Sequence, residues 1–356
     1  MTLDIICQRL HNQLLSQTKY TQPDQVVEWL GAVQAQDYAG AKWALGLRLK
    51  TATDGAIEKA FSEGRILRTH VMRPTWHFVT PADIRWMLAL TAPRVLPHLT
   101  YGDRQLGLDK TILKRSNTIL AKALKGGKQL MRSELEPILQ RGGVNTDGLR
   151  FIHLLMHAEL DGIVCSGGRR GKQFTYALLD ERAPQAKTLG RDEALAKLTR
   201  RYFQSHSPAT LQDYIWWSGL TAADARKGIE AVKLEFEQEV VDDQTYWFPA
   251  STPIGVPSPT VHLLPDFDEY MVGYTDRSSI FDVAHTDKLD SRGSILNQYA
   301  IVIAGRVAGT WKRTIKRNEV AIELSSFKPL KKIEDQAVYA AAQQYSQFLE
   351  LRDVVI

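Results

Sequence analysis

Apolar residues recur at helical spacing along much of the chain, beginning close to the N-terminus. One helical face there is formed by Leu3, Ile6, Leu10, Leu14 and Leu15. A second helix is predicted after Thr21, with Pro23 in its first turn, and it ends where Gln34 begins a polar stretch. The same spacing predicts helices over residues 41–49 and 54–62.

A strand-like segment follows these helices. Residues 67–79 are rich in β-branched and aromatic side chains, but Pro74 interrupts them and cannot donate a hydrogen bond to a neighbouring strand. We therefore expect an edge hairpin or a bulged strand there. A helix is predicted over residues 84–90, and a partly basic helical region interrupted by proline follows to about Leu108.

Residues 110–180 carry the clearest supersecondary pattern. Helices are predicted over residues 113–124, 134–141 and 147–159, and strands over 163–165 and 174–178. The tip of the hairpin between the two strands holds the cations Arg169, Arg170 and Lys172. Three helices followed by such a two-stranded wing are typical of a winged helix.

The pattern recurs further along the chain. Helices over residues 192–203, 210–217 and 221–234 precede a hairpin over 237–248, whose acidic tip does not suit phosphate binding. Residues 1–100 resemble a third, more elaborated copy in which the 67–79 segment takes the place of the wing. The predicted fold is therefore α+β and mainly helical, with three tandem winged-helix units.

A small β-rich domain is expected after a proline-rich linker, residues 249–259. Its predicted strands are residues 261–264, 271–274, 299–307 and 320–324, and its predicted helix is 334–349. The predicted domains are residues 1–109, 110–185, 186–250 and 251–356.

Composition places the chain among soluble globular proteins. It has 356 residues, of which 44% are hydrophobic and 24% charged. No apolar run reaches the roughly 18 residues that a transmembrane helix needs. The N-terminus lacks the features of a secretory signal peptide, so we expect a cytoplasmic protein with no membrane partner.

Charge and cysteine content restrict the classes of partner and site. The net charge is +5, and residues 101–205 alone carry +8. Such a block indicates either a polyanion-binding face or a solvated helical surface. Cys7 and Cys165 lie far apart with no Cys or His at metal-binding spacing, so we interpret them as reduced core residues and expect no metal or cofactor.

Two polar segments are candidates for a site. The first is Gln34-Ala-Gln36-Asp37, where two amides are separated by one small apolar residue. The second lies in the strand-like segment and contains His70, Arg73, Thr75 and His77. Arg73 and Thr75 offer a cation and a hydroxyl for a phosphate or a sugar; the alternative is a hydrogen-bonded, packed hairpin. No further Cys or His supports a metal site at the two histidines.

Two other segments offer cations for DNA. In the wing, Arg169, Arg170 and Lys172 suit phosphate contact, with a solvated hairpin tip as the alternative. Near the C-terminus, Trp311 precedes Lys312 and Arg313, which suits a stacking and phosphate surface. The alternative there is a solvated strand end with Trp311 in a core.

Residues 266–270 contain three carboxylates and resemble the acidic cluster of a nuclease; paired surface carboxylates or helix caps are the favoured interpretation.

Four motifs together resemble the AlkZ-like family of bacterial DNA glycosylases. They are Gln34-Ala-Gln36, Arg68-Thr-His70…Arg73-Pro-Thr-Trp-His77, Leu264-Pro-Asp-Phe-Asp-Glu-Tyr270…Gly273-Tyr-Thr-Asp-Arg277 and Gly309-Thr-Trp-Lys-Arg313. The resemblance covers nearly the whole chain. It implies a basic channel for double-stranded DNA and monofunctional excision of alkylated bases, with unhooking of interstrand crosslinks in some members. It also implies that Gln34 and Gln36 form the catalytic Gln-x-Gln motif, in which the middle residue is aliphatic.

The chemistry of a labile substrate suits two amides. An N-alkylated base is already cationic and departs readily, so the enzyme mainly has to hold a water beneath C1′ of the sugar. A glutamine carbonyl can orient that water, and its dipole can stabilise the positive charge that develops on the sugar. Asp37 is the alternative base. No lysine adjoins the motif, so lyase chemistry is not expected.

We therefore expect a monomeric glycosylase that acts on N-alkylated purines in double-stranded DNA. In this hypothesis Asp37, His70, Arg73, Thr75 and His77 support the sugar-phosphate. The alternative is a non-enzymatic DNA-binding protein or regulator, in which the 147–159 helix would present Arg150, His153 and His157 to a major groove. A degenerate protein-interaction module is a third class.

Overall fold

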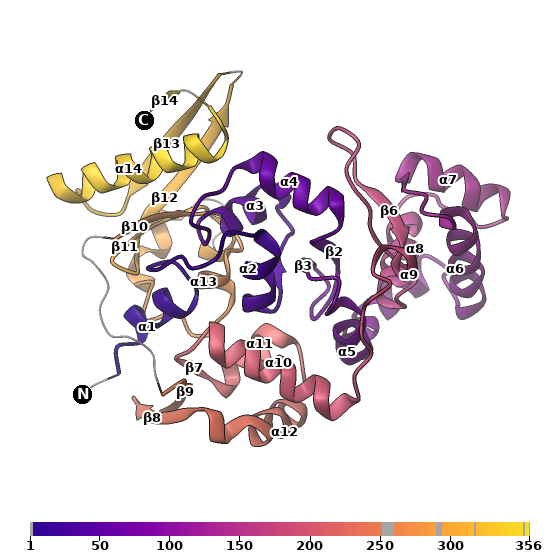
Figure 1. Cartoon of the computed structure of the whole chain (residues 1–356), viewed down its shortest axis with the longest axis horizontal. Coiled ribbons are helices and arrows are strands. Elements are labelled where there is room, and N and C mark those ends of the chain that lie inside the picture. The colour runs from indigo at the N-terminus through magenta and orange to yellow at the C-terminus, as the bar shows by residue number, and fades with distance from the viewer. Residues whose placement is uncertain (1–2, 251–259, 290–293, 317, 352, 356) are drawn as a thin grey trace. The chain divides into compact units, whose positions relative to one another are not determined.

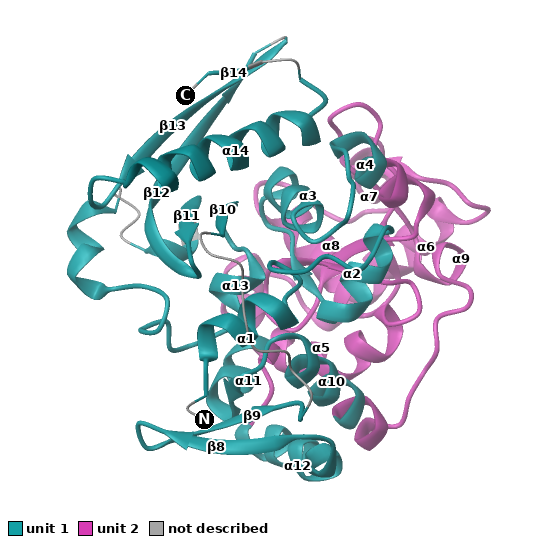
Figure 2. Cartoon of the chain, turned by 60° about the vertical axis from the view of Figure 1, so that its left-hand side comes forward, with its two compact units in different colours: residues 1–58, 196–217, 222–356 teal, residues 59–195, 218–221 magenta. Residues whose placement is uncertain are grey.

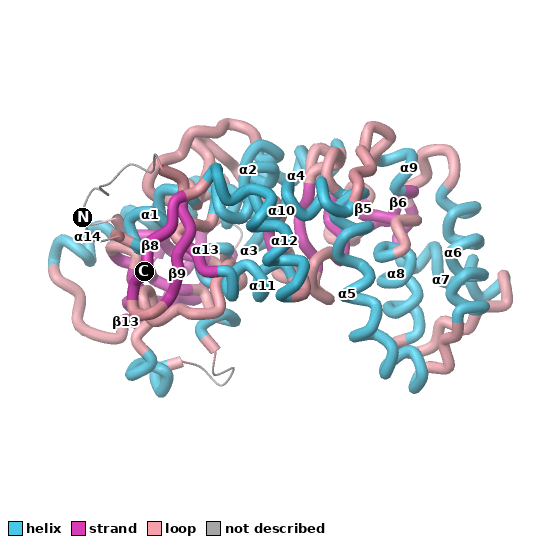
Figure 3. Tube along the Cα trace, turned by 90° about the horizontal axis from the view of Figure 1, so that it is seen from below, coloured by secondary structure: helices cyan, strands magenta, loops and turns pink. Residues whose placement is uncertain are grey.

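The chain folds as a mixture of helices and strands, with about half of its residues helical (Figure 3). The computed structural model describes residues 3–250, 260–289, 294–316, 318–351 and 353–355. These residues form two compact units (Figure 2). Unit 1 comprises Met1–Glu58, Ala196–Trp217 and Ala222–Ile356, and unit 2 comprises Lys59–Leu195 and Ser218–Thr221.

The predicted helices are present (Figure 1), with bounds that shift by a few residues. The α-helices are α1 (Ile5–Asn12), α2 (Pro23–Leu30), α3 (Tyr38–Gly46), α4 (Asp54–Glu63), α5 (Ile84–Gln105), α6 (Lys110–Leu124), α7 (Arg132–Arg141), α8 (Arg150–Leu160), α9 (Leu179–Arg182), α10 (Arg191–Ser205), α11 (Leu211–Ser218), α12 (Ala222–Val232), α13 (Glu269–Val272) and α14 (Lys332–Phe348). Short 3-10 turns are η1 (Lys233–Glu235), η2 (Val283–Lys288) and η3 (Ile295–Asn297).

The strands are mostly short, except in the C-terminal sheet. They are β1 (Val33–Gln34), β2 (Leu67–His70), β3 (Trp76–Val79), β4 (Leu130–Met131), β5 (Val164–Ser166), β6 (Thr175–Leu178), β7 (Ala209–Thr210), β8 (Glu237–Val241), β9 (Gln244–Phe248), β10 (Val261–Leu264), β11 (Ala300–Ile303), β12 (Arg306–Ile315), β13 (Glu319–Ser326) and β14 (Asp353–Val355).

Helix α5 is longer than its sequence predicts. It continues for 22 residues through Pro93 and Pro97, where an interrupted region was expected. Each proline removes a backbone donor, which weakens a helix interior. Packing compensates, because Val95 and Leu99 of α5 are buried in one cluster with Leu160 of α8. Tertiary burial therefore overrides the local signal.

Unit 2 contains two hairpins. The 67–79 segment is the expected hairpin: β2 pairs antiparallel with β3, with Leu67 opposite Val79 and His70 opposite Trp76, and Pro74 lies in the turn. The second hairpin, β5–β6, also pairs with the short strand β4, in the order β4-β6-β5. Its helices α6, α7 and α8 share a core that includes Leu120, Leu135 and Leu154.

The same arrangement recurs in unit 1. Strand β7 lies before α11, and it pairs with the hairpin β8–β9 in the order β7-β9-β8. The turn of that hairpin contains Asp242 and Asp243, both with positive φ (48° and 61°). Along the chain, β1, α3, α4, β2 and β3 follow one another in the same sequence of elements. Three segments thus share one order of helices and strands.

The C-terminal part of unit 1 is a five-stranded sheet in the order β10-β11-β12-β13-β14, and α14 packs along it (Figure 1). Two strand predictions were wrong. Residues 271–274 are not a strand, because Asp268 accepts a hydrogen bond from the N–H of Tyr270 (2.9 Å) and caps the short helix α13. The 299–307 segment is divided by a turn at Ala304-Gly305, where φ is 49° and 78°. The linker at 249–259 lies mostly outside the described residues.

The acidic cluster at 266–270 is partly a helix cap, as expected, but it is not on the surface. Asp268 is 1% exposed and binds both Nη1 and Nη2 of Arg48 at 2.8 Å, and Arg48 itself is fully buried. The remaining guanidinium donors go to the carbonyls of Gln13 and Ala44 and to the side chain of Gln13. This pair joins the N-terminal helices of unit 1 to α13.

Replacing Asp268 with Asn should destabilise the protein strongly. The substitution leaves the buried Arg48 without a counter-charge, which costs about 3–5 kcal/mol in comparable pairs. Urea unfolding measures the change as a lower midpoint at constant slope. The matched control is Glu319→Gln, which removes the carboxylate of the surface pair Lys316–Glu319 (2.7 Å) and should cost about 1 kcal/mol or less. Equal losses in the two variants would contradict the central role of the buried pair.

His262 of β10 should make stability depend on pH. Burial, together with the nearby positive charge of Arg48, lowers the pKa of His262 from 6.5 to about 4. Below pH 6.5 the imidazole of His262 is therefore protonated in the unfolded chain but stays neutral in the folded chain. The free energy of unfolding consequently falls between pH 6.5 and 4. We expect His262→Phe to remove about 3 kcal/mol of that loss. The measurement is the unfolding free energy of the wild type and of His262→Phe from pH 4 to 7.5. The same pH dependence in both proteins would contradict the prediction.

Candidate active site and DNA-contacting residues

The Gln34-Ala-Gln36 motif lies in a strand and the loop after it. Helix α2 ends at Leu30, Gly31 adopts φ 85°, and β1 follows, so the predicted helix end at the motif was wrong. Gly31 lies close to the ring of Trp217, since an added Cβ would be 3.4 Å from it. Gln34 is 8% exposed and Ala35 is fully buried, whereas Gln36 is exposed. The strand ends at Gln34, and Gln36 lies in the bend that follows it.

A buried carboxylate lies behind the motif. The backbone N–H of Gln34 donates to Oε1 of Glu269 at 2.8 Å, and Glu269 is fully buried. The indole N–H of Trp217 donates to Oε2 of the same carboxylate at 2.9 Å, and Nε2 of His206 lies 3.4 Å from it. Burial lowers the pKa of His206, while its contact with Glu269 acts in the opposite direction.

Asp37 serves the fold around the motif. Its carboxylate caps α3 by accepting a hydrogen bond from the N–H of Ala39 (3.1 Å). Its other oxygen accepts a short hydrogen bond from the hydroxyl of Tyr299 and lies 3.8 Å from Arg313. Burial raises the pKa of Tyr299, so this phenol stays protonated and remains a donor. Both carboxylate oxygens of Asp37 are thus engaged, which is unfavourable for a general base.

The second candidate segment lies in unit 2, on the β2–β3 hairpin. His70 is 3% exposed; its Nδ1 lies 2.5 Å from Oε2 of Glu159, and its backbone N–H donates to the same oxygen at 3.0 Å. His77 is fully buried, and its Nδ1 lies 3.0 Å from the carbonyl of Thr75. Both histidines therefore belong to the packed interior of unit 2.

Arg73 and Thr75 flank Pro74 in the turn of this hairpin and are half-buried. Successive tight hydrogen bonds shape the turn: the N–H of Arg73 donates to the carbonyl of Val71 and the N–H of Thr75 to that of Arg73, both at 2.7 Å. The hydroxyl of Thr75 is buried and has no hydrogen-bond partner among the residues the structure describes. Of the four predicted residues on the hairpin, these two are the more accessible.

The wing cations of β5–β6 differ in their surroundings. Arg170 forms an ion pair with Glu134 and donates to the carbonyl of Gln129 (2.9 Å). Arg169 is half-buried, and its guanidinium lies 5.2 Å from the ring of Phe174. Lys172 is exposed and makes no ion pair with another described residue. The side chain most available to a phosphate is therefore Lys172.

The C-terminal candidates are also divided. Trp311 is 1% exposed and donates from its indole N–H to the carbonyl of Leu264 at 2.9 Å, which matches the core alternative. Arg313 lies between Tyr299 and Tyr345 and is half-buried. Lys312 follows Trp311 in β12 and is exposed, whereas Trp311 is buried.

Comparison with known proteins identifies the family. A sequence profile of the family described as DNA glycosylase AlkZ-like matches residues 27–348. The chain belongs to the AlkZ-like DNA glycosylases. It is 22% identical over 365 residues to an interstrand DNA cross-link repair glycosylase from Streptomyces sahachiroi, covering 94% of each sequence. Its fold is similar to that of the DNA glycosylase AlkZ of the same organism, with a TM-score of 0.79 and 21% identity over 98% of this chain and 97% of that one.

The resemblance inferred from the four motifs is thereby confirmed, and DNA is the partner that membership of this glycosylase family implies. No helix in the part of the chain that the structure describes has the length and apolarity to cross a bilayer.

In this AlkZ-like chain, the predicted readers on α8 are already in use within unit 2. His153 and His157 both contact the carboxylate of Asp103, at 2.8 and 2.9 Å. Arg150 donates to the carbonyls of Asn145 and Leu106. A helix that reads bases needs free side chains on its outer face. These contacts weigh against the regulator alternative.

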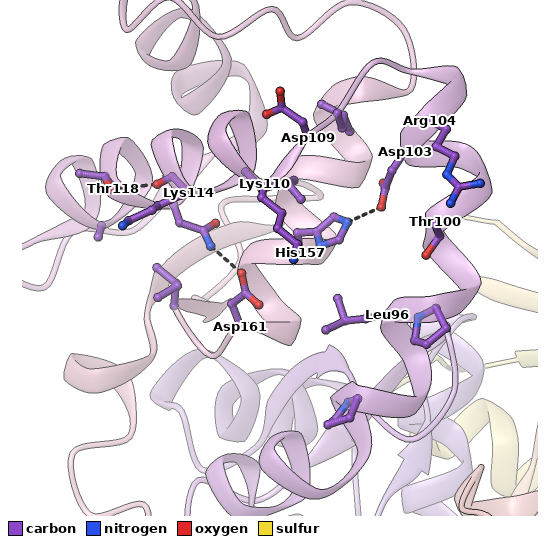
Figure 4. Close-up of a pocket in the computed structure, with 17 residues that line it drawn as sticks. Leu96, Thr100, Asp103, Arg104, Asp109, Lys110, Lys114, Thr118, His157 and Asp161 are labelled. Carbon is purple, nitrogen blue, oxygen red and sulfur yellow. Dashed lines mark hydrogen bonds and ion pairs between the residues drawn. The ribbon is translucent and has the colours of Figure 1, made fainter.

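Unit 2 of this AlkZ-like chain also holds a cavity of about 1180 Å³ that the sequence analysis did not anticipate (Figure 4). It lies between α5, α6 and the end of α8, and its lining includes the apolar Leu96. Among the other lining residues, Arg104, Lys110 and Lys114 form no ion pair with any described residue, whereas Asp103 is bound by two histidines. Its members come from separate helices, so no local sequence signal could have revealed it.

The supporting residues around the motif of this AlkZ-like chain were likewise missed. Glu269 and Trp217 are far from Gln34 in sequence, and these two residues and Arg48 each resemble an ordinary acid, aromatic or base in their local sequence. The one sequence feature that pointed to them is that residues 268 and 269 lie in one of the four motifs that resemble the family. There they were interpreted as helix caps or surface carboxylates.

Proposed function

We propose that this glycosylase excises N-alkylated purines, cationic or bulky, from double-stranded DNA, and that it unhooks interstrand crosslinks. It acts as a monomer and by a monofunctional mechanism. The name of the Streptomyces sahachiroi relative, an interstrand DNA cross-link repair glycosylase, supports the substrate class.

The observation that carries the mechanism is the state of the three polar residues of the motif. Asp37 is occupied on both oxygens by Ala39, Tyr299 and Arg313. We assign the water to Gln34 and Gln36, the two amides on either side of the buried Ala35. Their carbonyls orient the water beneath C1′, and their dipoles stabilise the oxocarbenium-like sugar as the cationic base departs. No strong base is needed because the leaving group already carries a positive charge.

We further propose that the three segments with one order of elements are tandem winged helices over residues 1–109, 110–185 and 186–250, followed by the C-terminal domain. The basic second copy binds phosphates through Lys172 and Arg169, with Arg170 held in place by Glu134. Lys312 adds a contact from the C-terminal sheet. At the β2–β3 turn, Arg73 and Thr75 support the sugar-phosphate, and His70 and His77 hold the hairpin that carries them.

The double variant Gln34→Ala/Gln36→Ala should lose excision of 7-methylguanine from alkylated duplex DNA. Without either amide the water is not held, and we expect a fall of about 10²-fold or more in the single-turnover rate. The measurement is base release at saturating protein, with thermal unfolding as a check that the variant folds. Asp37→Asn is the matched comparison: it keeps a cap acceptor and should retain most of the rate. Undiminished release by the double variant would refute the mechanism, and no release by the wild type would favour a regulator.

Lys172→Ala should weaken binding to any duplex by a similar factor and reduce the salt dependence of binding. Loss of one phosphate contact lowers the slope of log K against log salt by about 1. Fluorescence anisotropy between low and moderate salt measures that slope. The matched control is Lys227→Ala, an exposed lysine on α12 in the copy with the acidic hairpin, which should leave the slope unchanged. Identical slopes for the two variants would contradict a role for the basic hairpin.

A further inference from the structure

Glu269 has an acidic side chain that is fully buried and that takes no part in the chemistry described above. A buried carboxylate is costly unless donors surround it. Its contacts are divided between its two oxygens: Oε1 accepts the N–H of Gln34 at 2.8 Å, and Oε2 accepts the indole N–H of Trp217 at 2.9 Å. His206 approaches Oε2 at 3.4 Å. One of the groups that Glu269 binds is thus the backbone of the proposed catalytic motif.

The position of Glu269 is itself fixed from several sides. It begins α13, directly after the cap residue Asp268, which is bound by Arg48. Its own carbonyl accepts hydrogen bonds from the side chain of Gln13 (3.2 Å) and from the N–H of Gly273 (2.9 Å). Because these contacts hold the backbone of Glu269 in place, its carboxylate has little freedom to move. It therefore fixes the position of the backbone N–H of Gln34.

The contact between Glu269 and Gln34 fixes the backbone of the motif, from which the two amide side chains project. Trp217 makes two contacts near the motif: its ring lies against Gly31, and its N–H donates to the carboxylate of Glu269 that accepts the backbone N–H of Gln34. Ala35 is fully buried, which anchors the residue between the two glutamines. Because the backbone is fixed at 34 and 35, the two amide side chains have fewer orientations to lose when they bind a water.

We propose that Glu269 is a positioning residue for the glycosylase reaction, holding the Gln34-Ala-Gln36 motif through the backbone N–H of Gln34, with Trp217 and His206 completing the shell of its carboxylate. The inference rests on the proposed function, since it assigns to Gln34 and Gln36 the water-holding role. It adds that the motif depends on a charge-assisted hydrogen bond from a residue more than two hundred positions away in sequence.

The test is a double-mutant cycle between Glu269→Gln and Gln34→Ala. A glutamine presents only one carbonyl oxygen to donors that approach both oxygens, so either Gln34 or Trp217 loses its acceptor. We expect Glu269→Gln to lower the single-turnover rate on alkylated DNA at least tenfold at saturating protein, with little change in DNA affinity. In the Gln34→Ala background the same substitution should change the rate less than threefold. Multiplicative effects of the two substitutions would overturn the proposal, because they indicate a general structural role.

Asp213→Asn is the matched control for loss of a buried carboxylate. Asp213 is 1% exposed and accepts hydrogen bonds from the N–H groups of Thr210 (3.0 Å) and Thr275 (2.9 Å). It should reduce the unfolding temperature without changing the single-turnover rate of the folded protein. Trp217→Phe removes one donor to Glu269 but keeps the hydrogen bond between Glu269 and the N–H of Gln34. It should therefore lower the single-turnover rate less than Glu269→Gln does.

Hydrogen exchange gives a readout that does not require activity. In the wild type the amide of Gln34 should be protected, and peptides covering residues 31–37 should exchange at least tenfold faster at that amide in Glu269→Gln. Protection that is unchanged in Glu269→Gln would overturn the proposal whatever the kinetics show. A different result separates the two proposals. If the wild type releases no base, the proposed function fails. If Glu269→Gln also loses protection of the Gln34 amide in that case, the contact is structural only, and the catalytic role of Glu269 is overturned as well.

Discussion

The buried ion pair between Arg48 and Asp268 is the interaction on which the candidate active site depends. Both side chains are fully buried, so they stabilise the fold only because each satisfies the other and because Gln13 and Ala44 accept the remaining donors of Arg48. Asp268 also caps α13, and the next residue is Glu269. One pair of charges therefore determines where the carboxylate behind the Gln-x-Gln motif lies.

A cluster of aromatic side chains supports the other flank of the motif. Trp43 and Trp311 donate their indole N–H groups to the consecutive carbonyls of Leu263 and Leu264 in β10, at 2.7 and 2.9 Å. The ring of Tyr345 packs between the two tryptophans, 4.9 and 5.2 Å from them. Through Tyr299 and Arg313 this part of unit 1 reaches Asp37. The C-terminal sheet thus acts as a support for residues 34–37.

Unit 2 uses its polar residues differently. Glu159 binds His70 and Asp103 binds two histidines of α8, so these buried acids hold the hairpin and the helices together. The cations that remain accessible lie at hairpin tips and helix ends, where they can meet a polyanion without rearranging a core. The side chains that stabilise unit 2 and the cations proposed to contact DNA are therefore different residues, the first buried and the second accessible.

By itself, the sequence determined most of the helices and the repeated order of helix and hairpin, because periodicity and local turn chemistry depend on neighbouring residues. The Gln-x-Gln motif was assigned only through the resemblance to the family. The tertiary structure decided which polar residues are buried. Trp311 became a core donor, Asp37 a cap, and His70 a partner of Glu159, although each reads as an equally good surface residue. Burial depends on contacts between distant segments, such as Gln34 with Glu269, and local patterns carry no information about them.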